Sequence, residues 1–322
     1  MNRRQVLARL ALPFVAALTL TTTQATAQTR EAVRVGYQKY GTLIILKAKG
    51  GLEQRLAPLG IDVKWTEFPA GPVLLEGLNV GSIDIGTVGE APPIFAQAAG
   101  ANLVYFGHEP PAPGGEAIVV PKNSTLKSPK DLKGKKVVLN KGSNVHYLLV
   151  KVLEANGLQY KDIEPVFLPP ADARAAFERG AVDAWVIWDP FLAAAEKQLG
   201  ARVLADGTGV AKNHQFYLAS RPYAERRPDV VNIVIEELAK IDAWAKANPR
   251  AVAEFLAPVI ALDVDIVELA ARRFSYGVTP LNDSVVAEQQ KIADTFHDLK
   301  LIPKKLVVSD VIWKPKSSVA SR

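Results

Sequence analysis

The chain has 322 residues, of which 48% are hydrophobic and 22% are charged, and its formal net charge is +6. This composition is typical of a folded protein large enough for two hydrophobic cores, and it argues against a mainly disordered chain. The sequence contains no cysteine, which excludes disulfides, thiolate metal sites and a cysteine nucleophile.

The first residues predict an export signal. Three arginines among the first nine residues precede an apolar stretch at 10–20 and a small-x-small end at 25–27. This order is typical of a signal peptide, here cut after Ala27, and the apolar stretch is short for a membrane span. The pair Arg3-Arg4 leaves both the general and the twin-arginine export routes open. Either route delivers the protein outside the cytoplasm, and we expect the periplasm.

Removal of residues 1–27 lowers the formal net charge from +6 to +3, because the segment holds three arginines and no acidic residue. The remaining charges are spread evenly along the chain. Proteins that bind nucleic acid normally carry a basic face or stripe, so we expect no nucleic-acid partner.

Strands and helices alternate along the first part of the mature chain. The residue patterns predict strands at 33–37, 62–68, 83–86 and 102–106, and helices at 43–49, 72–79 and 92–99. Such alternation indicates a parallel sheet with crossover helices, and therefore an α/β fold.

The same alternation repeats in a second block. Strands are predicted at 117–120, 135–139, 165–168, 184–187 and 215–219, and helices at 145–154, 171–179 and 191–199. Two βαβ blocks therefore follow one another in the chain.

From Pro228 onward the pattern becomes helical, with one apolar stripe at three- and four-residue spacing. Because these helices have no sheet of their own, we expect the chain to return to the first block. The predicted organisation is a discontinuous lobe one (residues 28–114 and 220–322) and a lobe two (115–219). A ligand cleft is expected between the lobes, which would close about crossings near Gly115 and His214. Residues 315–322 are predicted to form a polar tail.

Four strand-to-helix junctions, at 38–42, 89–92, 141–144 and 188–190, are candidates for a binding site. Ligands of open α/β sheets bind beyond the carboxyl ends of the strands. A helix start at Ser143 or Asn144 offers unpaired backbone N–H groups and a partial positive charge, which together favour an oxyanion. Each junction taken alone also fits simple helix capping, but their occurrence in both blocks favours a shared anion site.

Several residues at these junctions leave alternatives open. Lys39 also fits a solvated surface lysine. Glu90 fits a helix-start acid, a hinge contact or a carboxyl kept protonated by burial. Trp188 is predicted to give an apolar wall for the tail of a ligand, whereas Trp185 and Phe191 fit an ordinary core.

Signatures of catalysis and of metal binding are scarce. Ser143 and His146 lie three residues apart, but no acid is placed to orient the histidine. The four histidines are scattered without the spacing of a metal site, and the sequence contains no P-loop. We therefore expect no catalytic residue, no metal site and no cofactor.

Four long stretches, at 35–39, 76–86, 140–149 and 181–190, closely resemble the aliphatic sulfonate-binding proteins of bacterial ABC importers. The resemblance spans nearly all of the mature chain. It implies a two-lobed periplasmic binding protein of type II, in which each lobe is a mainly parallel sheet flanked by helices. Such a protein captures alkanesulfonates for sulfur acquisition and hands them to a membrane permease that is driven by an ATPase. We expect it to be a monomer.

The resemblance also implies a set of ligand-binding positions at the four junctions. They are Gln38, Lys39, Tyr40, Gly41, Thr42, Gly89, Glu90, Ala91, Gly142, Ser143, Asn144, Trp188 and Asp189. Related proteins with this fold bind taurine, nitrate or thiamine precursors, and the absence of cysteine counts against the precursor binders. The alternatives are therefore a taurine or nitrate binder, an enzyme of the same fold, or a ligand-sensing partner of a membrane receptor.

Overall fold

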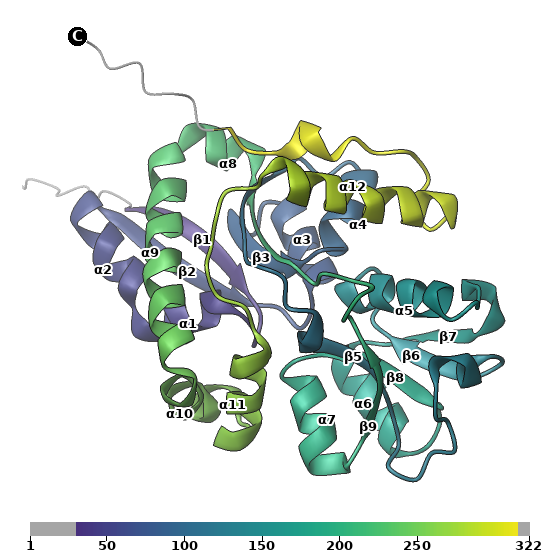
Figure 1. Ribbon diagram of the computed structural model, residues 1–322. Coiled ribbons are helices and arrows are strands. Elements are labelled where there is room, and N and C mark those ends of the chain that lie inside the picture. The colour runs from purple at the N-terminus through teal and green to yellow at the C-terminus, as the bar shows by residue number, and fades with distance from the viewer. Residues whose placement is uncertain (1–29, 315–322) are drawn as a thin grey trace, which may run out of the picture. The chain divides into compact units, whose positions relative to one another are not determined.

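The computed structural model describes residues 30–314, so the predicted signal peptide and the tail at 315–322 lie outside the described residues. Within that range the chain forms two five-stranded sheets. Figure 1 shows that helices flank both sheets. The predicted α/β fold class is confirmed. No helix between residues 30 and 314 is both long and apolar enough to cross a membrane.

The first sheet has the strand order β2-β1-β3-β10-β4. Its strands are β1 (Glu31–Tyr37), β2 (Ile61–Glu67), β3 (Ile85–Gly89), β4 (Leu103–His108) and β10 (Gln215–Ser220). The helices between the first four strands are α1 (Thr42–Lys49), α2 (Gly51–Leu56), α3 (Gly71–Asn79) and α4 (Pro92–Ala98). Strand β3 begins and ends later than the sequence pattern predicts, since Ile83 and Asp84 form the approach to it.

The second sheet has the order β7-β6-β8-β5-β9. Its strands are β5 (Glu116–Val120), β6 (Lys136–Leu139), β7 (Glu164–Phe167), β8 (Ala184–Trp188) and β9 (Arg202–Asp206). Its helices are α5 (Asn144–Ala155), α6 (Pro170–Glu178) and α7 (Phe191–Leu199). Strand β9 is absent from the prediction, because its half-buried residues show no clear apolar alternation. Trp185 is 1% exposed in the core of this sheet, as predicted.

Strands β5 and β10 run antiparallel to both of their neighbours. Each follows a direct crossing from one sheet to the other, without the crossover helix that a parallel connection needs. The predicted placement of the strand at 215–219 in the second block is wrong, because β10 pairs with β3 and β4 of the first sheet. The second crossing therefore ends before Gln215.

The two crossings lie side by side. The backbone N–H of Ala112 donates to the carbonyl of Lys212 (3.0 Å), and the N–H of Gly207 donates to the carbonyl of Pro113 (3.1 Å). The side-chain amide of Asn213 donates to the Ala112 carbonyl at 2.8 Å. These bonds make the connection between the sheets a paired, two-stranded link.

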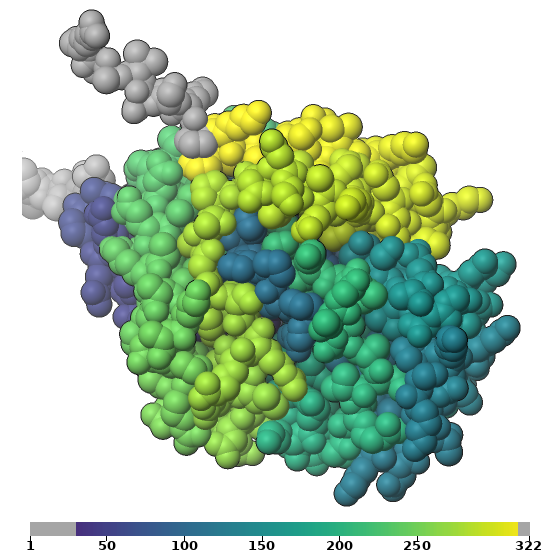
Figure 2. All heavy atoms as spheres, viewed as in Figure 1, coloured from purple at the N-terminus to yellow at the C-terminus, as the bar shows by residue number. Residues whose placement is uncertain are grey.

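The C-terminal helices are α8 (Arg221–Arg226), α9 (Pro228–Ala247), α10 (Pro249–Ile260), α11 (Val264–Arg273) and α12 (Asp283–Asp298). Helices α9 and α10 pack on α1 and share the hydrophobic core of the first sheet. Helix α11 also contacts α7 of the second sheet, and Figure 2 shows the yellow-green segment that holds α11 beside the teal segment that holds α7. Part of the returning chain therefore bridges the two sheets.

Two paired glycines let α3 approach the first sheet closely. Gly36 of β1 and Gly86 of β3 are register partners. A Cβ atom on Gly86 would lie 2.5 Å from Cδ2 of Leu74, a fully buried residue of α3. The absence of side chains at this pair therefore sets the distance between helix and sheet.

We predict that Gly86→Ala lowers the free energy of unfolding by about 1–3 kcal/mol, because Leu74 has no room to move away from the new methyl group. Urea unfolding followed by circular dichroism measures the change. Gly114→Ala is the matched control, since a Cβ there meets nothing within 4 Å. Equal stability of the two variants would contradict the packing account.

Candidate functional site

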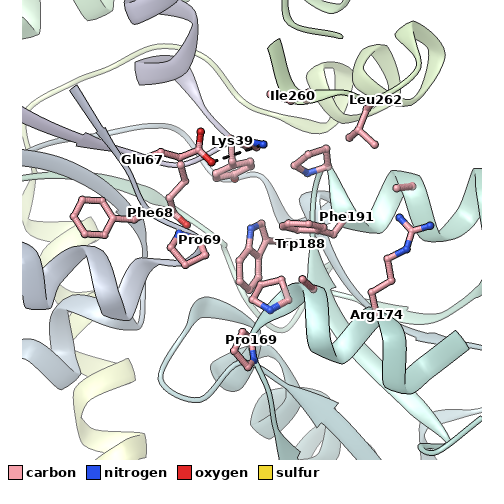
Figure 3. A pocket seen from close by; sticks show the side chains of 16 residues that line it. Lys39, Glu67, Phe68, Pro69, Pro169, Arg174, Trp188, Phe191, Ile260 and Leu262 are labelled. Atoms are coloured by element: carbon pink, nitrogen blue, oxygen red, sulfur yellow. Dashed lines mark ion pairs between the residues drawn. The ribbon is translucent and has the colours of Figure 1, made fainter. Parts of the chain in front are cut away.

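A cavity of about 290 Å³ lies where the carboxyl ends of strands from both sheets meet, as Figure 3 shows. The first sheet contributes the β1–α1 junction (38–40) and the β2–α3 junction (67–69). The second sheet contributes the β7–α6 junction (169–171) and the β8–α7 junction (188–191). The cavity thus occupies the position that the strand directions predict for a ligand.

Two of the four predicted junctions line this cavity and two do not. Gln38, Lys39, Tyr40 and Trp188 are lining residues. In place of the junctions at 89–92 and 141–144, the structure brings the β2–α3 and β7–α6 junctions to the site. The cavity is therefore shared between the sheets, and its loops differ in part from the predicted set.

The walls of the cavity are mainly apolar rings. The rings of Trp188 and Phe191 meet edge to face, with centroids 6.2 Å apart. Prolines contribute from three junctions, at Pro69, Pro169 and Pro190. Phe191, which the sequence pattern also fits to an ordinary core, is half-buried and faces the cavity. Rigid rings of this kind suit the apolar part of a small molecule.

Three charged side chains line the cavity. Lys39 Nζ lies 3.7 Å from Glu67 Oε1, and both side chains are nearly half exposed. Such a long, solvated ion pair contributes little to stability, so either group is free to exchange partners. Arg174 donates from Nε to Glu178 (2.6 Å) and from an Nη to Gln198 (2.9 Å). These contacts hold its guanidinium on the α6 side of the cavity.

Helix starts add positive potential to the same space. Tyr40 lies just before α1, Pro170 and Ala171 open α6, and Phe191 opens α7. The first turn of each helix carries backbone N–H groups without intrahelical partners and a partial positive charge. The cavity therefore favours an anion with an apolar body.

Tyr40 is a partly buried residue that lines the cavity. Its ring meets Phe274 edge to face, with centroids 5.3 Å apart. Burial, followed by the carboxyls of Asp189 and Glu116, raises the pKa of the Tyr40 phenol well above its ordinary value. The phenol therefore stays neutral and keeps its proton available for donation.

Four predicted residues of the β1–α1 and β8–α7 junctions have neighbours away from the main cavity. Gln38 donates to the Thr87 carbonyl at 3.1 Å, and the Thr42 hydroxyl donates to Asp242 at 2.7 Å. Gly41, with a positive φ of 77°, lines a smaller neighbouring cavity. Asp189 accepts from the Ala193 N–H at 2.9 Å. Of these four residues, only Gln38 also lines the main cavity.

The predicted junctions at 89–91 and 142–144 meet each other in the closed interior. A Cβ on Gly89 would lie 2.9 Å from Cβ of Asn144, so the two sheets touch at this point. The Asn144 amide donates to Glu116 (2.5 Å) and to Asn213 (3.1 Å). Ala91 is fully buried beside them. These residues form the contact between the sheets and do not line the main cavity.

The Ser143 hydroxyl and the Gly142 backbone N–H also have partners within the protein. The Ser143 hydroxyl donates to the Asn140 carbonyl at 2.8 Å, and the Gly142 N–H donates to Nδ1 of His146 at 3.2 Å. Because each group already has another partner, the Ser143–His146 pair that a hydrolase would need does not form. Helix α5 begins at Asn144 without a side-chain cap, so simple capping does not explain these residues either.

Glu90 is a buried carboxyl, only 1% exposed, at the contact between the sheets. Its Oε2 accepts from the His214 N–H at 3.1 Å, while Oε1 has no partner. Burial raises the pKa of Glu90 to about 7, although backbone N–H groups of His214 and Asn213 oppose the shift. Burial and the Glu90 carboxyl in turn raise the pKa of Glu116. This supports the alternative in which burial keeps Glu90 protonated.

An ion pair joins α11 to the β8–α7 junction. Arg273 lies 3.5 Å from Asp189 and 2.6 Å from Glu196. Burial raises the pKa of Asp189 to about 7, and the Arg273 guanidinium opposes this rise. The ion pair connects the returning C-terminal helices to the second sheet beside the cavity.

Several lining residues are absent from the predicted site. They are Glu67, Phe68, Pro69, Pro169, Pro170, Ala171, Arg174, Pro190, Ala194, Ile260 and Leu262. Glu67 and Phe68 end the predicted strand at 62–68, Pro69 follows it, and residues 169–171 follow the predicted strand at 165–168, so the rule on carboxyl ends, applied to every strand, would have found these six. Ile260 and Leu262 arrive through the return of the chain and carry no local signal. Among the described residues, no group of three or more His, Asp or Glu side chains could hold a metal ion.

We predict that stability falls as pH rises from about 4.5 to about 7, because the folded state holds the Glu90 proton more tightly than the unfolded chain does. Each pH unit in this window corresponds to about 1.4 kcal/mol for one such group. Glu90→Gln removes this contribution. The difference in the free energy of unfolding, variant minus wild type, should therefore increase as the pH rises from 5 to 8. Urea unfolding at each pH measures it.

Glu164→Gln, at an exposed position, is the control for this experiment. Its free energy of unfolding, plotted against pH, should run parallel to that of the wild type. Parallel curves for Glu90→Gln and wild type would show that Glu90 titrates as an ordinary surface acid.

Comparison with known proteins identifies the family. The model of the NMT1-like family matches residues 26–261. The solved alkanesulfonate-binding protein SsuA of Xanthomonas axonopodis pv. citri, bound to MOPS, is 42% identical, with a TM-score of 0.83 over 88% of this chain and 98% of that one. The solved periplasmic aliphatic sulfonate-binding protein SsuA of Escherichia coli is 46% identical, with a TM-score of 0.80 over 89% and 93% of the two chains.

A solved desulfurization enzyme, DszB, shares the fold at only 16% identity, with a TM-score of 0.64 over 89% of this chain and 97% of that one. At this identity the likeness shows the fold alone, whereas the two binding proteins match in sequence along nearly their whole length. The chain therefore belongs to the NMT1-like family by its family model, and its relatives at 42% and 46% identity confirm the predicted membership of the aliphatic sulfonate-binding protein family.

Proposed function

We propose that this protein is the substrate-binding component of an ABC importer, and that it captures aliphatic sulfonates in the periplasm and delivers them to a membrane permease for sulfur acquisition. Relatives at 42% and 46% identity are sulfonate-binding proteins. We further propose that the protein acts as a monomer, with an ATPase driving the permease from the cytoplasm.

The observation that carries this proposal is the cavity between the sheets, which joins an apolar chamber to helix starts and cationic side chains. A sulfonate stays ionised at physiological pH, so its binding needs fixed donors and positive potential but no proton uptake by the ligand. The ring-lined walls suit its alkyl body. An ionised head group with an apolar tail fits both halves of this site.

Binding at this cavity would also favour the closed arrangement of the sheets. A ligand shifts a conformational equilibrium only when it binds the two states differently. Here Gln38 and Tyr40 come from the first sheet and Trp188 from the second, so one ligand would contact both sides. The crossings near Gly115 and His214 are the proposed hinge.

We assign the head group to the part of the cavity beside Gln38, Lys39 and Tyr40, and the tail to the wall of Trp188 and Phe191. We propose that Glu90, Ser143 and Asn144 affect the closure of the two sheets, because their contacts hold the sheets together next to the hinge.

Taurine is the second candidate, because its ammonium could pair with a carboxylate in the cavity. Glu67 lines the cavity within reach of a ligand, whereas Glu90 and Asp189 do not line it. In the protein alone, Glu67 faces Lys39 at 3.7 Å. A preference for taurine would therefore require Glu67 to exchange one ammonium for another.

We predict that the purified mature protein binds alkanesulfonates more tightly than sulfate, nitrate or taurine in isothermal titration calorimetry. The reason is that only alkanesulfonates fill the apolar part of the cavity without a second charge. Catalytic turnover of a bound sulfonate, or tighter binding of nitrate, would contradict the proposed function.

Trp188→Ala should weaken alkanesulfonate binding by about tenfold or more, since it removes a buried ring from the ligand wall. Trp244→Ala is the matched control, because Trp244 lies under Lys49 and does not line the cavity. Circular dichroism and thermal unfolding should show that both variants are folded. Equal affinities of the two folded variants would place the ligand elsewhere.

A further inference from the structure

A second, smaller cavity of about 40 Å³ adjoins the main one. Four residues line both cavities, namely Lys39, Tyr40, Pro190 and Ile260. These shared residues form the partition between the two spaces. Figure 3 shows Ile260 and Leu262 on the segment that faces Trp188 and Phe191 across the main cavity.

The second cavity is lined mainly by α1, α10 and α11. Beyond the four shared residues, its wall consists of Gly41, Ile44, Ile45, Val252, Leu256, Val267, Ala270, Ala271, Phe274 and Tyr276. All of these except Tyr276 have wholly apolar side chains or none. The only charged lining residue is Lys39, which belongs to the partition.

The chemistry of this wall determines what it can hold. Polar side-chain atoms occur in this wall only at Lys39, Tyr40 and Tyr276, and the rest of it is apolar. A linear hydrocarbon segment that entered from the main cavity would contact the apolar side chains and would remove its own surface from water.

We propose that the second cavity is a tail subsite for the distal methylene and methyl groups of linear alkanesulfonates, entered past Pro190 and Ile260 of the partition. This inference rests on the proposed function, because it takes the sulfonate head to lie in the main cavity. It adds a chain-length specificity to that function, and it assigns this specificity to α10 and α11 instead of either sheet.

The subsite makes affinity depend on chain length in a defined way. Each methylene transferred from water into an apolar environment contributes about 0.8 kcal/mol, or roughly a fourfold gain in affinity. The gain should continue beyond the chain lengths that fill the main cavity and should end when the second cavity is full. The long and medium chains, and not the short ones, would therefore be the preferred substrates.

The experiment measures dissociation constants by calorimetry for the series ethane-, butane-, hexane- and octanesulfonate. The wild type should bind hexane- and octanesulfonate at least about tenfold more tightly than butanesulfonate, as two to four additional buried methylenes require. Val267→Phe fills the second cavity from α11, and this variant should lose most of that gain while its affinity for ethanesulfonate changes by less than about twofold.

Val264→Phe is the matched control, because it makes the same substitution on the same helix at a partly buried position that lines neither cavity. It should retain the wild-type preference for long chains. Val267→Ala, which enlarges the cavity, should shift the optimum toward longer chains. Binding of ethanesulfonate shows that each variant is folded.

The outcomes separate the two proposals. If ethanesulfonate and its longer homologues all fail to bind the wild type, the proposed function fails. If they bind but affinity is flat beyond butanesulfonate, or if Val267→Phe keeps the full gain, the tail subsite is wrong and the second cavity is a packing void.

Discussion

The structure depends on one geometric constraint, which is that the carboxyl ends of two separate sheets face the same space. Helices that follow those strands point their unpaired N–H groups toward it, so positive potential gathers there without a cluster of exposed cations. The paired crossings and the contact between Gly89 and Asn144 hold the two sheets together. The anion-favouring character of the cavity is thus a property of the topology, and the side chains of Trp188 and Phe191 adapt it to a ligand with an apolar body.

A second feature of the structure is the set of buried carboxyls at and beside the contact between the sheets. Glu90 and Glu116 are almost completely buried, and burial raises the pKa of both. A raised pKa favours the neutral form of each carboxyl, and the neutral form lessens the repulsion that two charged carboxyls would exert across this contact. Asp189, whose pKa burial also raises, differs in having Arg273 as an ion-pair partner.

The sequence predicts most of the local elements, because strand alternation, glycine stops and helix starts are short-range signals. Of the predicted site residues, only Gln38, Lys39, Tyr40 and Trp188 line the main cavity. It cannot predict that Asn144 packs on Gly89, since that contact depends on how the two sheets meet, and a cap-forming asparagine looks the same in either setting. The placement of β10 in the first sheet and of α11 against α7 depends on contacts between distant parts of the chain. Ile260 and Leu262 reach the cavity for the same reason, so composition and periodicity give no sign of them.

The most direct test of the central claim is a crystal structure of the mature protein with hexanesulfonate. The account predicts a sulfonate group between the β1–α1 and β8–α7 junctions, within hydrogen-bonding distance of groups from both sheets. Its alkyl chain should lie along Trp188 and Phe191 and point toward Ile260. A sulfonate bound to groups of one sheet only, or at a surface away from this cavity, would contradict it.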